Sequence, residues 1–285
     1  MAGILYVVAT PIGNREDFSP RAQLVLAEAD VIACEDTRHS RPLLAAFGIT
    51  GELLSYHEHN EDQMTPRLLK RLQAGEAVAL ISDAGTPLIS DPGFLLVRAA
   101  REQGIRVEPI PGPCAAICAL SAAGLPSDRF LFVGFPPRTS VQRLAWCQGF
   151  AREPGTLICY ESARRAAATL ADLAAGLGAE RRAVVARELT KRFETFLVDR
   201  LDTLAEQVAA SPEQQLGELV ILIEGDPRGD DERERAEQLR VLGLLAAELP
   251  LKQAAALTAA ITGGARNQLY KEALAARDQP GPWSG

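Results

Sequence analysis

Residues 78–93 read VALISDAGTPLISDPG, a short apolar run followed at once by a long polar loop. The run is continuous rather than alternating, which is typical of a strand covered on both faces of a parallel sheet. The loop holds two Asp, two Gly, two Pro and three hydroxyl residues. Gly and Pro fix backbone angles that other residues rarely adopt, so the loop has a defined shape. The pattern predicts a structured, functional loop at the carboxyl edge of a parallel sheet.

Similar apolar runs recur along the chain and predict further strands. They lie at residues 4–9, 31–34, 107–110, 130–135, 156–160, 183–186 and 219–223. Stretches with helical spacing separate them, at residues 22–29, 68–74, 95–103, 115–122, 164–177 and 201–210. This alternation predicts α/β architecture with mainly parallel sheets.

The length of 285 residues suggests roughly two such domains. A punctuated break, GLPSD, divides the α/β region, so we expect an N-terminal α/β domain at 1–123 and a C-terminal α/β domain at 124–228. Residues 226–237, DPRGDDERERAE, carry no apolar pattern and predict a solvated linker. Helical patterns follow at 239–249, 251–261 and 267–276, which predicts a small helical module over residues 237–278.

The last two helical patterns meet at a Gly-containing turn, TGGAR, which is the layout of a helix-turn-helix. Residues 251–277 carry four basic side chains and one acid, a net charge of +3 that opposes the rest of the chain. We therefore expect an RNA-contacting module. The side chains expected to contact RNA are Lys252, Arg266, Lys271 and Arg277. The alternative is a helical hairpin packed on the body or in a dimer interface.

Composition narrows the class of protein. The net charge of −7 disfavours a general nucleic-acid binder, because phosphate neutralisation needs clustered Lys and Arg. No apolar run reaches the roughly 18 residues that a membrane span needs, and the N-terminus has no basic region of a secretion signal. Five cysteines without a C-x-x-C pair predict free thiols in a reducing cytoplasm. His57 and His59 form the single close histidine pair, with no Cys nearby, so no metal site is expected.

Other loops that follow predicted strands are candidate ligand sites. Residues 9–14, ATPIGN, hold a Pro where a dinucleotide fingerprint has Gly, and the chain has neither G-x-G-x-x-G nor a Walker A motif. This argues against an ordinary NAD enzyme, a P-loop NTPase and a conventional Rossmann methyltransferase. Residues 109–116, PIPGPCAA, stiffen the entry to a helix of small residues, where a ligand can approach backbone N–H groups. Plain turns and tight helix packing are the alternatives.

Seven segments in order resemble the tetrapyrrole-methylase superfamily and, within it, the branch that methylates small-subunit ribosomal RNA. They read LYVVATPIGN, ADVIACEDTRHS, LISDAGTPLISDPG, PIPGPCAA, YESARR, RELTKRFE and GELVILIEG. The resemblance extends into the tail through LPLKQAAAL and RNQLYKEAL. It implies two α/β domains, S-adenosylmethionine in the cleft between them, a homodimer, and 2′-O-methylation of a cytidine ribose in the decoding region of 16S rRNA on the small ribosomal subunit.

The resemblance also implies the residues that bind the methyl donor, in large part through their backbone. They are Pro11, Asp83, Ile89, Ser90, Ala115, Ala116, Glu161, Leu189, Gly217 and Glu218. One departure is visible, because Cys114 stands where family members often have Ser, which puts any hydroxyl-dependent contact there in doubt.

Transfer to a ribose 2′-oxygen needs in-line placement about 3 Å from the methyl carbon, and a weak hydroxyl nucleophile benefits from a base or a polarising cation. The candidate bases are Asp36, Glu161 and Glu188. The candidate activators or phosphate clamps are Arg38, Arg187 and Lys191. Of these, Asp36, Arg38, Glu188 and Lys191 are the predicted catalytic residues.

Two other functions compete with this one. A small-molecule methylase acting on a tetrapyrrole would have the same fold. A non-enzymatic regulator could use the α/β body as a ligand sensor and the helical tail to bind nucleic acid.

Overall fold

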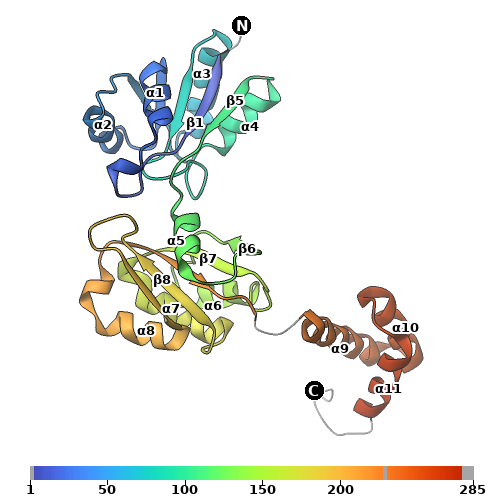
Figure 1. Cartoon of the computed structure of the whole chain (residues 1–285). Helices are drawn as coiled ribbons and strands as arrows, with labels where there is room; N and C mark the ends of the chain where they lie inside the picture. Colours follow the sequence, from blue (N-terminus) through green and yellow to red (C-terminus); the bar gives the residue numbers. More distant parts are fainter. Residues whose placement is uncertain (1–2, 227–229, 278–285) are drawn as a thin grey trace. The chain divides into compact units, whose positions relative to one another are not determined.

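The computed structural model describes residues 3–226 and 230–277, and the side chains of all these except 230–233, 276 and 277. The chain forms two compact units, Met1–Gly225 and Asp226–Gly285 (Figure 1). The first unit contains two five-stranded sheets, and the second contains three helices. Among the described residues, no helix combines the length and apolar character that a membrane crossing requires.

The first sheet is entirely parallel, with the strand order β3-β2-β4-β1-β5. Its strands are β1 (Ile4–Val8), β2 (Val31–Cys34), β3 (Glu52–Ser55), β4 (Val78–Ile81) and β5 (Arg106–Ile110). The helices between them are α1 (Pro20–Glu28), α2 (Thr37–Ala46), α3 (Glu61–Gln73) and α4 (Phe94–Glu102), with a short 3-10 turn at Arg15–Asp17. Alternate residues of β2 enter two different cores, Val31 with Leu68 of α3 and Ile32 with Leu26 of α1. The sheet is therefore covered on both faces, as the continuous apolar runs predict.

The second sheet has the order β6-β7-β10-β8-β9. Its strands are β6 (Phe130–Phe132), β7 (Thr156–Ser162), β8 (Arg182–Arg187), β9 (Thr195–Arg200) and β10 (Glu218–Ile223). Only the β6–β7 pair is parallel, and the other three pairs are antiparallel. The α/β architecture is confirmed, but the prediction of mainly parallel sheets is wrong for this one. Apolar runs indicate burial on both faces and not strand direction, and the direct connection from β8 to β9 makes that pair antiparallel.

Helices cover both faces of the second sheet. They are α5 (Ala115–Ala123), α6 (Ser140–Gln148), α7 (Ala163–Leu177) and α8 (Leu201–Ala210), with a 3-10 turn at Pro212–Gln215. Leu170 of α7 and Leu204 of α8 pack with Ile221, whereas α5 packs through Leu120 against Val220 on the opposite face. Helix α5 thus belongs by its packing to the second sheet, although it precedes the expected domain boundary at residue 124.

The second unit consists of α9 (Asp230–Glu248), α10 (Leu251–Thr262) and α11 (Arg266–Arg277). A small apolar core joins the three helices, with Leu242, Ala254 and Leu269 among its buried residues. Gly263 ends α10 in the left-handed conformation and forms the predicted turn to α11. The linker predicted at 226–237 is wrong from residue 230 onward, because this segment is the start of α9. Its Glu and Arg residues are good helix formers, and Arg235 pairs with Glu272 of α11.

Candidate functional site

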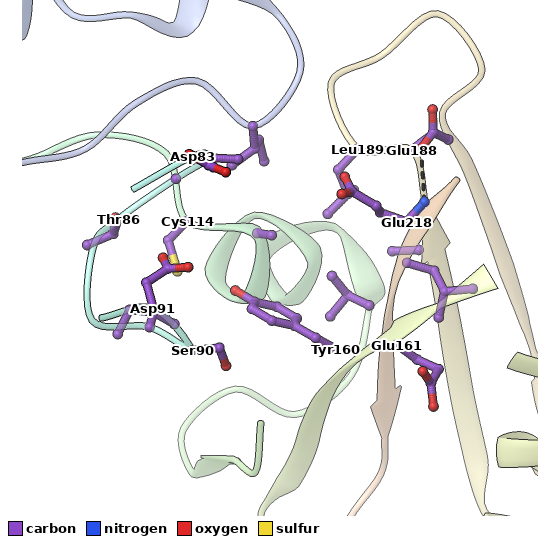
Figure 2. Close-up of a pocket in the computed structure, with 18 of the residues that line it drawn as sticks. Asp83, Thr86, Ser90, Asp91, Cys114, Tyr160, Glu161, Glu188, Leu189 and Glu218 are labelled. Atoms are coloured by element: carbon purple, nitrogen blue, oxygen red, sulfur yellow. Dashed lines mark hydrogen bonds between the residues drawn. The ribbon is translucent and has the colours of Figure 1, made fainter. Parts of the chain in front are cut away.

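A cavity of about 360 Å³ in the first unit is lined by segments that follow strands of the first sheet and by strands and loops of the second sheet (Figure 2). The first part of the chain supplies Ile12, Asp83, Ala84, Gly85, Thr86, Ile89, Ser90, Asp91, Cys114 and Ala115. The second part supplies Phe135, Tyr160, Glu161, Ser162, Ala186, Glu188, Leu189, Lys191, Glu218, Leu219 and Val220. Figure 2 shows Tyr160 between the loop that carries Ser90 and Asp91 and the segments that carry Glu188, just after β8, and Glu218, at the start of β10.

The loop after β4 forms the first wall of the cavity and is held by neighbouring loops. Thr10 and Gly85 exchange backbone hydrogen bonds at 2.9 and 3.1 Å. The Thr86 hydroxyl donates to the Pro113 carbonyl at 2.9 Å. Leu88 and Ser90 adopt left-handed angles, with φ of 73° and 69°. Such angles persist in residues with a Cβ only where the surroundings enforce them, so this loop presents its side chains in a fixed arrangement.

Carboxyl groups gather along this wall. Asp83 accepts a hydrogen bond from the Asp36 amide at 3.2 Å. Burial raises the pKa of Asp91 to about 7, and the negative charges of Glu35 and Asp83 add to the effect. Burial and the charge of Asp83 also raise the pKa of Glu35. A group that carries positive charge, or that donates hydrogen bonds, would relieve this repulsion.

Replacing Asp91 by Asn should remove a pH dependence of stability. A folded-state pKa of about 7, above the ordinary value of 3.8, means that this carboxyl favours the folded state at low pH. That contribution is complete below the ordinary value and is lost as the pH rises through 7. We compare the melting temperature of Asp91→Asn with that of the parent at each pH. The variant's advantage should be about 2–4 °C larger at pH 8 than at pH 5.

Thermal melts of both proteins at the two pH values check this expectation. Asp62→Asn, a change at an exposed aspartate of α3, serves as the control and should give the same difference from the parent at both pH values. Equal behaviour of Asp91→Asn and Asp62→Asn would contradict the assignment of Asp91 as the titrating group.

The opposite wall carries an ion-pair cluster. Glu188 accepts hydrogen bonds from the Glu218 amide at 3.0 Å, drawn in Figure 2, and from the Lys191 ammonium at 3.1 Å. The same ammonium donates to Glu218 at 3.0 Å. Burial would raise the pKa of Glu188, but the Glu218 amide and Lys191 outweigh it and lower the pKa. Glu188 is therefore charged near neutral pH and weakly basic.

Gly217 makes room for this cluster. Its φ of +87° is a left-handed angle, and a Cβ there would lie 2.2 Å from Glu188 Oε1. A residue with a side chain at this position would displace the Glu188 carboxylate from the Glu218 amide.

Both carboxylate oxygens of Glu161 are occupied. This residue is 2% exposed at the end of β7. Its Oε1 accepts from the Ser162 amide at 2.7 Å, and its Oε2 accepts from the Thr169 hydroxyl at 2.7 Å. Arg165 pairs with Oε2 at 3.0 Å. The side chain is therefore bound to the first turns of α7, and it is poorly placed to accept a proton from a substrate.

Seven of the ten predicted donor-binding residues line the cavity: Asp83, Ile89, Ser90, Ala115, Glu161, Leu189 and Glu218. The other three, Pro11, Ala116 and Gly217, adjoin lining residues without being part of the lining. Of the predicted catalytic residues, Glu188 and Lys191 line the cavity, and Asp36 and Arg38 do not.

Asp36 and Arg38 instead form the start of α2. Asp36 accepts from the Arg38 amide at 2.8 Å, and the two side chains pair at 2.6 Å. These hydrogen bonds from Arg38 lower the pKa of Asp36 to about 2. Arg187, the remaining candidate activator, is buried and donates to the carbonyls of Phe193 and Leu216, each at 3.2 Å.

Several lining residues were not predicted from the sequence. Tyr160 is the most prominent, because its hydroxyl accepts a hydrogen bond from the Ala116 amide at 3.1 Å and so joins α5 to β7. Asp91 and Thr86 belong to the loop that was singled out, but no role was assigned to them. Phe135 is the last residue of a predicted strand, 130–135, and carried no polar signal. The described residues contain no cluster of three or more His, Cys, Asp or Glu side chains that could hold a metal ion.

Two family models match the chain. The model for Tetrapyrrole (Corrin/Porphyrin) Methylases matches residues 4–205, and the RsmI C-terminal HTH domain matches residues 232–277. The chain belongs to the tetrapyrrole methylase family. Within that family it is 57% identical to the ribosomal RNA small subunit methyltransferase I of Pseudomonas aeruginosa, over 96% of this chain and 97% of that protein. The protein of the same name from Escherichia coli O157:H7 is 52% identical, over 95% of each chain.

Solved structures of other methyltransferases and of diphthine synthase share the fold. Uroporphyrin-III C-methyltransferase from Thermus thermophilus, complexed with S-adenosyl homocysteine, is 23% identical with a TM-score of 0.54, over 81% of this chain and 99% of that one. Diphthine synthase is 15% identical with a TM-score of 0.57, over 78% of this chain and 90% of that one. The predicted family membership and helix-turn-helix module are confirmed.

Proposed function

We propose that this chain transfers a methyl group from S-adenosylmethionine to the 2′-oxygen of a cytidine ribose in the decoding region of 16S rRNA. The observation that carries the proposal is the cavity. Its loops come from both sheets, and the chain that forms them is 57% identical to a ribosomal RNA small subunit methyltransferase I over nearly its whole length.

The cavity suits the methyl donor in size and in chemistry. Ala186, Leu189 and Val220 are buried apolar residues of the lining, which suits an adenine ring. Asp83 and Ser90, on the wall opposite these apolar residues, offer oxygen atoms that can accept hydrogen bonds from hydroxyl or ammonium groups of the methyl donor. When bound, S-adenosylmethionine supplies an electrophilic methyl group on a sulfonium centre. The carboxylates along the first wall complement that positive charge.

The chain's own contribution to the reaction is chiefly placement. Asp36, Glu161 and Glu188 each accept a hydrogen bond from a backbone amide, so none is a free carboxylate. We therefore assign Glu188 and Lys191 a positioning role at the cavity wall, beside Glu218. Holding two reactants in line accounts for a large share of the barrier reduction in such transfers.

The helical module is the proposed RNA contact outside the cavity. Lys252, Arg266 and Lys271 are exposed, and none pairs with an acid among the described residues. The side chain of Arg277 lies outside the described ones. Exposed basic side chains in a helix-turn-helix module suit phosphate contacts. We further propose that the enzyme is a homodimer and works in the cytoplasm, where ribosomal subunits are assembled.

Transfer of labelled methyl from S-adenosylmethionine tests the function. We expect labelling of 30S subunits at one cytidine 2′-oxygen, identified by nuclease digestion and mass spectrometry, and little labelling of uroporphyrinogen. Labelling of the tetrapyrrole alone would support a small-molecule methylase. Donor binding without transfer to any RNA would overturn the proposal.

The triple variant Lys252→Ala, Arg266→Ala, Lys271→Ala tests the RNA contact. Each lost phosphate contact should reduce the slope of log affinity against log salt by about 0.7–0.9. We therefore expect weaker binding to rRNA and a slope about 2 shallower, measured by filter binding at several salt concentrations. The control is the double variant Arg67→Ala, Lys70→Ala on α3, which should leave the slope unchanged. Equal slopes for the triple variant and the parent would contradict the assignment.

A further inference from the structure

Phe135 is a large apolar side chain left 56% exposed at the cavity. It follows β6, and its ring meets the Tyr160 ring edge-on at a centroid distance of 5.7 Å. Tyr160 is itself fixed by the hydrogen bond from the Ala116 amide and by an edge contact with Phe132 at 4.8 Å. A rigid neighbour therefore holds one edge of the Phe135 ring, and much of the ring stays open.

Two arginines hold the backbone that carries this ring. Arg165 donates to the carbonyls of Pro136 and Pro137 at 2.8 and 2.9 Å. Arg143, which is 5% exposed, donates to the carbonyls of Pro137 and Arg138 at 3.1 and 2.9 Å. Charged groups thus fix a segment that has no regular secondary structure.

Each arginine is in turn held by a carboxylate. Arg165 pairs with the buried Glu161, and Arg143 pairs with Asp172 at 2.6 Å. This gives the Glu161 carboxylate a structural role. It pairs with Arg165, and Arg165 in turn binds the backbone carbonyls next to Phe135. An exposed aromatic ring with such support is preorganised for a flat partner, because little side-chain or loop entropy remains to be lost on binding.

The position of Phe135 distinguishes between the two flat groups of the reaction. The adenine of the methyl donor is suited by the buried apolar residues Ala186, Leu189 and Val220. Phe135 faces solvent as well as the cavity, which suits a group that arrives with a large substrate. Unpaired RNA bases characteristically stack on exposed aromatic side chains.

We propose that Phe135 is the platform on which the base of the acceptor nucleotide stacks, and that Glu161 and Arg165 position it. The inference rests on the proposed function, since it takes an RNA nucleotide as the acceptor. It assigns Phe135 to the acceptor and not to the methyl donor.

The test compares Phe135→Ala and Phe135→Trp with the parent enzyme. Loss of one base–aromatic stack should lower kcat/KM for 30S subunits about 10- to 100-fold, chiefly through KM. The affinity for S-adenosylmethionine, measured by calorimetry without RNA, should stay within about twofold if only the acceptor stack is lost. Phe135→Trp should retain most of the activity, because Trp also stacks. Phe130→Ala is the control, because Phe130 is also exposed (43%) and lies at the other end of β6 from the cavity.

A double-mutant cycle tests the positioning role. Arg165→Ala should raise KM for 30S subunits as Phe135→Ala does, and the two changes together should cost little more than one. Additive losses would mean that Arg165 acts only on overall stability. They would overturn the positioning role of Arg165. The stacking role of Phe135 would then be decided by the Phe135→Ala and Phe135→Trp comparisons alone.

Three results would overturn the platform itself. One is Phe135→Ala with the parent's KM for 30S subunits, and a second is Phe135→Ala with a tenfold weaker donor affinity. The third is an oligomeric state of Phe135→Ala that differs from the parent's in light scattering, which would show that Phe135 is an interface residue. If the parent transfers no methyl to RNA, the proposed function fails. The platform is then tested by binding of single-stranded cytidine-rich RNA, which Phe135→Ala should weaken if the platform exists.

Discussion

Gly217→Ala is expected to lower kcat/KM by more than about 100-fold, through loss of the Glu188 cluster. The added Cβ would lie 2.2 Å from Oε1 of Glu188 and 2.5 Å from its Cδ. The side chain would have to leave the Glu218 amide and Lys191, which breaks two hydrogen bonds to a charged group. Bonds of this kind contribute about 1.5–3 kcal/mol each, and the left-handed angle adds strain.

Gly48→Ala is the control that separates the backbone strain of a left-handed residue from the displacement of the Glu188 side chain. Gly48 also has a left-handed φ, +68°, but nothing lies within 4 Å of an added Cβ. This control should cost about 1 kcal/mol of stability and leave donor affinity unchanged. Steady-state methyl transfer to 30S subunits measures kcat/KM of both variants, calorimetry with S-adenosylmethionine measures their donor affinity, and thermal melts measure their stability. Equal donor affinity of Gly217→Ala and Gly48→Ala would show that the Glu188 cluster does not shape the donor site.

The sequence predicted best where backbone geometry is fixed locally. The loop after β4 was identified from its Gly, Pro and Asp content, and it forms one wall of the cavity. The continuous apolar runs of β1, β2 and β4 correctly indicated a parallel sheet covered on both faces. These features depend on neighbours in the chain, which a sequence displays directly.

The sequence failed where the outcome depends on contacts between distant segments. In the second sheet, β10 pairs antiparallel with β7 and β8, which lie far from it in the chain, and Arg235 of α9 pairs with Glu272 of α11. Asp36 and Arg38 pair at the start of α2 and do not line the cavity, a placement that the sequence does not display. Phe135 gave no polar signal, so its place at the cavity emerged only from the fold.

Glu161→Ala is expected to destabilise the protein by about 3 kcal/mol, because it leaves Arg165 and the Thr169 hydroxyl without their shared partner. Glu161→Gln keeps the size and part of the hydrogen bonding and should cost less. If Glu161 were the general base, Glu161→Gln would lower kcat by several orders of magnitude and leave the fold intact. The bound state of both its oxygens predicts the reverse, a clear loss of stability with kcat per folded molecule reduced by no more than about tenfold.

Asp172→Asn provides the matched control for Glu161→Gln. Asp172 forms the other carboxylate–arginine pair that supports the Phe135 segment, and it is not part of the cavity lining. Urea unfolding and single-turnover methyl transfer should give similar losses for the two variants, because both loosen the same segment. At equal stability, Glu161→Gln could lose far more of its single-turnover rate than Asp172→Asn does. That result would support Glu161 as the general base. The comparison separates chemistry from support, because only one of the two carboxylates borders the cavity where methyl transfer is proposed to occur.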